Sequence, residues 1–149
     1  MTIREIDDLF YVCSLIEFVG RQVKNSNRDI VEKMGKKGLE QQLYEAEVNH
    51  CLSFEEIGDE VIEEFDLKEG SFDSVGSCEF RVPDYTAIGG VYRDLILDFK
   101  KESGGEIVDI MYDVFTSFIS DEISNFNAST FYENPSYIYH SYVAGELLD

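Results

Sequence analysis

The twelve residues from Leu9 to Gly20, LFYVCSLIEFVG, constrain the fold more than any other part of the chain. They carry a single charged side chain, Glu17, and no helix-breaking residue before the final glycine. Apolar side chains recur every three or four residues on two sides of a helix, which predicts a helix from about Arg4 to Lys24. Because this helix is apolar most of the way round, other elements must enclose it. It is too short, and too charged at both flanks, to span a bilayer.

Capping residues and apolar spacing predict six further helices. The clearest start is at Ser53, with Glu56 at the third helical position as in a capping box. The apolar stripe of that helix consists of Phe54, Ile57, Val61 and Phe65. The other expected caps are Ser26, Asp84, Ser103 (paired with Glu106 in a second capping box) and Asn134 (followed by Pro135). The six helices are expected over about residues 27–34, 39–50, 54–65, 85–101, 104–124 and 135–145.

Residues 66–84 lose the helical period and predict a loop. Within it, apolar Cys78, Phe80 and Val82 alternate with polar residues until Pro83, which is typical of one short strand. A lone strand needs a partner, for which residues 72–75 are the candidate. With 149 residues, 44% of them hydrophobic, the chain can bury one sizeable core. The sequence therefore predicts a mainly α, single-domain (1–149) bundle of about seven helices, with at most a small β-hairpin near residues 72–82.

Part of the N-terminal half resembles a known kind of protein. The order VCSLIEFVGRQV, then IVEKMG, then LYEAEVNHCLSFEEIGDEVIEEF, between Leu9 and Phe65, is similar to small helical bacterial proteins catalogued only as domains of unknown function. Members of such families often lie beside putative toxin genes. The resemblance implies an antitoxin- or immunity-like role and offers no catalytic residue to transfer.

The charge of the chain is extreme and unevenly distributed. There are 31 acidic and 12 basic residues, for a net charge of −19. Residues 38–67 and 102–149 contain no lysine or arginine, whereas a basic shoulder, defined by Arg21, Lys24, Arg28, Lys33, Lys36 and Lys37, lies near the N-terminus. Such a field opposes contact with nucleic acid or an anionic membrane and speeds encounter with a basic protein. High acidity can also serve solubility alone.

The densest acid lies on the helix that Ser53 caps. Its acidic residues are Glu55, Glu56, Asp59, Glu60, Glu63 and Glu64, followed by Asp66. Four pairs of like charges fall at four-residue spacing, and each costs about 0.2–0.5 kcal/mol in an isolated helix. A helix that needed only a solvated face would gain from interspersed lysines, so we expect a basic partner for these acids. That partner is either the basic shoulder, which economy favours, or another protein.

A second candidate surface lies near the C-terminus. Its members are Tyr132, Tyr137, Tyr139 and Tyr142, in the segment FYENPSYIYHSY. Rings with polar tips suit protein interfaces. Packing of these rings against the core is the alternative.

Few residues suggest catalysis or metal binding. Glu47 and His50 have the i, i+3 spacing of di-metal carboxylate bundles, but only one such motif occurs. We expect Cys13, Cys51 and Cys78 to be buried small side chains rather than nucleophiles. Glu17, inside the apolar stretch, needs a partner, which Arg21 can supply one helical turn later. No phosphate-binding glycine loop is present, and we expect no cofactor.

The functional hypothesis is a cytoplasmic, non-enzymatic module that covers a basic surface of a partner protein with residues 55–66. A cytoplasmic location fits the odd, unpaired cysteines and an N-terminus unlike a signal peptide. One alternative is a nucleic-acid mimic that inhibits a DNA-binding protein. Another is a metal-dependent enzyme that uses Glu47 and His50.

Overall fold

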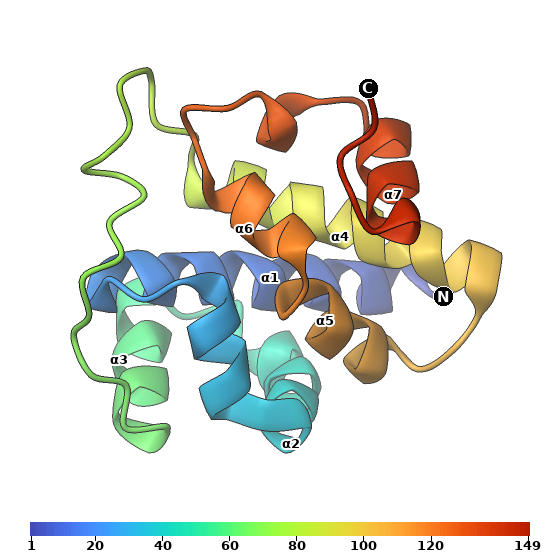
Figure 1. The fold of residues 1–149 in the computed structure, drawn as a ribbon. Helices are drawn as coiled ribbons and strands as arrows, with labels where there is room; N and C mark the ends of the chain where they lie inside the picture. Colours follow the sequence, from blue (N-terminus) through green and yellow to red (C-terminus); the bar gives the residue numbers. More distant parts are fainter.

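The computed structural model describes all 149 residues and contains helices but no strand (Figure 1). The helices are α1 (Ile3–Val23), α2 (Asn27–Asn49), α3 (Phe54–Glu64), α4 (Tyr85–Ser103), α5 (Ile107–Phe115), α6 (Phe118–Ser124) and α7 (Pro135–Ala144), with a short 3₁₀ helix, η1 (Thr130–Tyr132). The predicted mainly α bundle is confirmed. No helix is both long enough and apolar enough to cross a membrane.

Helix α1 lies at the centre of the molecule, as its sequence predicts. Its residues Leu9, Val12 and Val19 are completely buried, within one hydrophobic cluster of 28 residues. Helix α4 lies along α1 on one side, with α5 to α7 packed around α4, while α2 and α3 lie on the other side (Figure 1). The apolar surface of α1 is therefore covered by other helices on both sides.

The number of helices is as predicted, but the chain is divided differently. Residues 27–49, labelled α2, are two helical segments that meet at a kink, and the predicted end of the first segment at Gly35 is confirmed by its non-helical φ of 67°. The predicted helix over 104–124 breaks after Phe115 instead, because the hydroxyl groups of Thr116 and Ser117 donate to backbone carbonyls of α5. Ser117 then caps α6 through the amide of Ile119.

Four of the five predicted caps are confirmed. The side chains of Ser26, Ser53, Asp84 and Asn134 each accept a hydrogen bond from a backbone amide in the first turn of their helix. The predicted capping box of Ser103 with Glu106 is wrong. Ser103 is the last residue of α4, and Glu106 precedes α5 without a side-chain capping bond. Gly104 and Gly105 separate the two helices with φ values of 73° and 103°.

The predicted strand pair at residues 72–82 is wrong, because local turns and the rest of the protein satisfy this backbone. The carboxylate of Asp73 accepts from the amide of Gly76, which makes a turn where the first strand would run. The amide of Glu79 donates to the side chain of Asn127 at 2.7 Å instead of to a neighbouring strand. Residues 65–84 thus form an irregular connection along one edge of the molecule (Figure 1).

Glu17 is paired as predicted, within a buried polar network. Its Oε2 accepts from Arg21 Nε at 2.7 Å, and its Oε1 accepts from Asn27 Nδ2 at 2.8 Å. Arg21 also donates to the carbonyl of Pro83. Next to Asn27 lies the Tyr92 hydroxyl, 2.9 Å from Ser120 Oγ. This network joins α1, α2, α4 and α6, and the buried carboxylate has a partner for each of its oxygens.

Candidate functional site

Helix α3 is fixed to α1 by a narrow apolar face. Ile57 and Val61 are almost fully buried, and Phe54 and Phe65 are half-buried at either end, as the sequence predicts. Gly58 brings the two helices close, since a Cβ at this position would lie 3.1 Å from the ring of Phe18. The apolar residues therefore direct every acidic residue of α3 toward solvent.

The α3 acidic face consists of six exposed carboxylates, from Glu55, Glu56, Asp59, Glu60, Glu63 and Glu64. The molecule has six ion pairs, and none of them involves this face. Along α3, carboxylates four residues apart repel one another, which opposes helix formation. The face is thus an uncompensated negative surface, built on a rigid helix of 11 residues.

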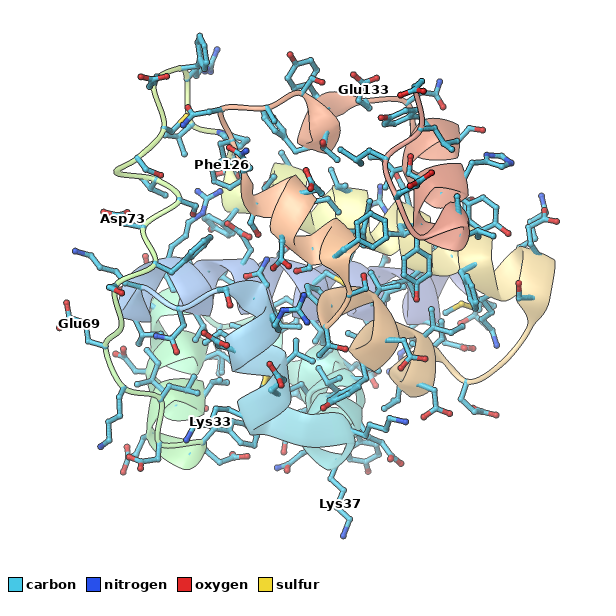
Figure 2. The ribbon with its side chains drawn as sticks, in the orientation of Figure 1. Lys33, Lys37, Glu69, Asp73, Phe126 and Glu133 are labelled. Carbon is cyan, nitrogen blue, oxygen red and sulfur yellow. The ribbon has the colours of Figure 1, made fainter.

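The basic shoulder does not neutralise this face, which corrects the expectation that the acids would be satisfied internally. Arg21 binds Glu17 on its own helix, Arg28 binds Asp121 of α6, and Lys36 binds Asp109 of α5. Figure 2 shows Lys37 extending away from the rest of the molecule. Arg28 and Lys36 thus join α2 to α6 and α5, whereas Lys24, Lys33 and Lys37 form no ion pair with any acid, including those on α3.

Asp66, the last acid of the segment, differs from the six before it. It lies beyond the end of α3 with a φ of 52°, and its carboxylate binds Lys68 Nζ at 2.7 Å. The hydrogen bond and charge of Lys68 lower the pKa of Asp66. We therefore exclude Asp66 from the α3 acidic face.

The four tyrosines do not form one exposed surface. Tyr132 is 69% exposed, whereas Tyr137, Tyr139 and Tyr142 are half-buried and pack against the core. The hydroxyl of Tyr137 donates to the carbonyl of Leu148 at 2.8 Å and holds the C-terminal segment. The ring of Tyr142 meets Phe99 edge-on, and burial raises the pKa of its hydroxyl. Helices α3 and α7 lie at opposite corners of the molecule in Figure 1, so the two candidate surfaces are not contiguous.

Glu47 and His50 line one groove between α1 and the end of α2, but each side chain has its own partner. The carboxylate of Glu47 forms an ion pair with Arg4 of α1, and His50 Nδ1 is 3.0 Å from the carbonyl of Ala46. No group of three or more His, Cys, Asp or Glu side chains in the molecule could hold a metal ion. Cys13 is buried as expected, and Cys78 is only half-buried. The expectation of burial is wrong for Cys51, which is exposed with its sulfur 3.8 Å from His50 Nε2.

A groove that the sequence did not reveal lies beside α3. It has a volume of about 630 Å³ and follows α1 from Ile3 to Ser14, and the ends of α2, α3 and α4 complete it. We call it the α1 groove. Asp7 and Asp8 line it, and they were not among the site residues predicted from the sequence. The available sequence signal was a pair of acids followed closely by two aromatic residues, in DDLFY.

The α3 acidic face can attract and bind cations. No protein-family model, curated protein or solved structure matches the chain. The resemblance of residues 9–65 to small helical bacterial proteins therefore stays a prediction.

Proposed function

We propose that this protein is a non-enzymatic binding module, antitoxin- or immunity-like, that covers a basic surface of a partner protein with the α3 acidic face. The observation that carries the proposal is the set of six exposed carboxylates that no lysine or arginine of the chain pairs with. A cytoplasmic location, as in the sequence hypothesis, belongs to the same proposal.

A basic partner relieves a cost that the free protein bears. Each like-charge pair on α3 is unfavourable by about 0.2–0.5 kcal/mol, and cations placed between the carboxylates turn this repulsion into attraction. The negative field also steers a basic protein toward α3 and raises the association rate at low salt. Because the face lies on a helix that is already formed, binding orders the glutamate side chains but not the backbone.

The acids on α3 favour a compact basic patch over a nucleic-acid-binding cleft as the target. An 11-residue helix is about 16 Å long. A nucleic-acid mimic needs charges spaced over a longer surface, because DNA carries about one charge per 1.7 Å of its axis. The α3 acidic face matches one patch of a few lysines and arginines.

Charge reversal tests the proposal. The protein is used to capture its partner from the native cell, and the variant with Glu56, Glu60, Glu63 and Glu64 replaced by lysine is compared with it in the same experiment. We expect the variant to lose the captured protein because like charges now face each other. The captured protein should be basic, and its binding should weaken steeply with salt.

The matched control reverses four exposed acids outside α3, namely Glu40, Glu69, Glu79 and Glu146. Both variants carry the same net charge, so a general loss of acidity affects them equally. Retention of the partner by the control and its loss by the α3 variant support the proposal. Equal binding by the α3 variant and the unmodified protein contradicts it.

A further inference from the structure

The α1 groove combines an acidic end with an aromatic wall. Asp7 and Asp8 of α1 and Glu47 of α2 lie toward its outer end, where Arg4 neutralises Glu47 alone. Farther along, the rings of Tyr11 and Phe54 are stacked, with centroids 5.2 Å apart. Carboxylates beside aromatic rings suit a cation on an apolar stem, because the stem packs on the rings while the charged head meets the acids.

The inner end of the groove contains a polar atom without a partner. Ser14 is 1% exposed, it lines the groove, and its Oγ makes no hydrogen bond. The hydroxyl is closed off from the groove because it packs on Gly89 of α4, where a Cβ would lie 2.1 Å from Ser14 Oγ. The inner end of the groove is therefore the tight contact between α1 and α4, and the charged and aromatic residues nearer its outer end are the groups that a bound molecule can meet.

The groove continues the α3 acidic face. Phe54 is the first residue of α3 and one wall of the groove. Burial, and the charge of Glu60 on the exposed side of α3, raise the pKa of Tyr11 to about 12. A molecule that covers α3 can therefore also contact the groove, at Phe54.

The length of the groove defines the size of its occupant. From Ile3 to Ser14 the helical rise amounts to about 16 Å. An extended peptide advances about 3.3 Å per residue, so about five residues fit. A volume of about 630 Å³ exceeds the needs of a single side chain.

We infer that the α1 groove binds a short extended segment of the same basic partner, with one lysine or arginine among Asp7, Asp8 and Glu47 and its apolar stem on the rings of Tyr11 and Phe54. This inference rests on the proposed function, because the partner that covers α3 supplies the segment. The α3 acidic face alone would hold the partner only through surface charge. The α1 groove adds a pocket of defined shape to the same interaction.

A model peptide tests the inference without the partner. The probe is a five-residue peptide, acetylated and amidated at its ends, with one arginine among alanines and leucines; its control has citrulline, a neutral isostere, in place of arginine. The backbone amide signals of the ¹⁵N-labelled protein are followed during titration. We expect saturable shifts at Asp8, Ser14 and Thr86 with the arginine peptide, and affinity at least about fivefold lower with citrulline.

Three variants separate a cation site from other kinds of site. Asp7→Asn combined with Asp8→Asn should weaken the arginine peptide about tenfold, because two exposed ion pairs are each worth up to about fivefold. Arg4→Ala should strengthen it up to about fivefold, since Glu47 becomes free. Ser14→Ala should leave the affinity for the peptide unchanged and the free protein as stable as before or more so, because the hydroxyl is inaccessible and makes no bond.

Contrary results are equally specific. Unmoved groove amides, equal affinity for the citrulline peptide, or weaker binding by Arg4→Ala overturn the inference. If the peptide shifts only α3 amides, the groove inference fails and the proposed function stands. If reversal of the α3 acids leaves the captured partner bound while the Asp7/Asp8 variant loses it, the proposed function fails and the groove site stands.

Discussion

At the scale of single residues, Glu17 is a buried carboxylate with a partner for each of its oxygens. Its side chain is 4% exposed, and its two oxygens bind Arg21 and Asn27. A buried ion pair contributes little net stability compared with apolar residues of the same size, but removal of one partner leaves the other charge unpaired. The network therefore specifies how α1, α2 and α4 meet.

Glu17→Ala should lower the free energy of unfolding by about 3 kcal/mol, the lower end of the usual cost of breaking a buried pair. The lower end applies because Arg21 keeps its bond to the carbonyl of Pro83. Urea unfolding followed by the helical circular dichroism signal measures the loss. Glu17→Gln, which keeps the shape and one acceptor, should cost less than Glu17→Ala. A loss below about 1 kcal/mol for Glu17→Ala would show that the pair has no structural role.

At the scale of elements, the contact between α1 and α4 depends on one glycine. A Cβ at residue 89 would lie 2.8 Å from the backbone nitrogen of Ser14 and 2.9 Å from its Cα. Backbone atoms of a packed helix have no rotamer to change, so any larger residue separates the helices. Since α4 covers the most apolar element of the chain, this separation exposes core surface.

Gly89→Ala should therefore destabilise the protein by at least about 2 kcal/mol through overpacking. Gly90→Ala is the matched control, because the nearest atom to its new Cβ is the end of the Arg93 side chain at 3.6 Å. That variant should gain about 0.5–1 kcal/mol from the helix preference of alanine. Thermal and urea unfolding of both variants give the comparison, and equal stability of the two would refute the proposed close contact.

The elements that the sequence predicted correctly are those specified by local chemistry. The capping side chain of Ser53 and the apolar stripe through Ile57 and Val61 specify α3 within a dozen residues, and the structure agrees. The predictions were wrong where contacts between residues far apart in the sequence determine the local structure. The side chain of Asn127 accepts a hydrogen bond from the amide of Glu79, which lies 48 residues earlier in the sequence. No pattern within residues 72–82 indicates this bond. The groove and the pairing of the basic shoulder likewise depend on helices that meet only in the folded protein.

At the scale of the whole molecule, repulsion exceeds attraction among the charges. There are 31 acidic residues and a net charge of −19, but only six ion pairs. A net charge this far from zero destabilises the compact state through self-repulsion. Salt shortens the range of the repulsion to about 10 Å at 0.1 M.

The urea midpoint should consequently rise as sodium chloride increases from about 0.02 M to about 0.5 M. The rise should be smaller for a variant in which Glu56, Glu60, Glu63 and Glu64 are glutamine, because part of the repulsion is removed. Unfolding curves at matched temperature and pH provide the test. A midpoint that falls with salt would mean that the ion pairs outweigh the repulsion.

The central position of α1 has a consequence for folding during synthesis on the ribosome. Helix α1 is synthesised before α2 to α7. Helix α4 covers one side of α1, and it ends 80 residues after Val23. At about 5–20 residues per second, ribosomes need on the order of 10 s to supply that cover. Nascent chains stalled after Glu64 should be digested by protease and bound by chaperones, and chains stalled well past Ser103 should resist both. Equal resistance at the two lengths would contradict this order of events. Because α1 is synthesised before the helices that cover its apolar surface, the nascent chain should depend on chaperones until α4 has left the ribosome.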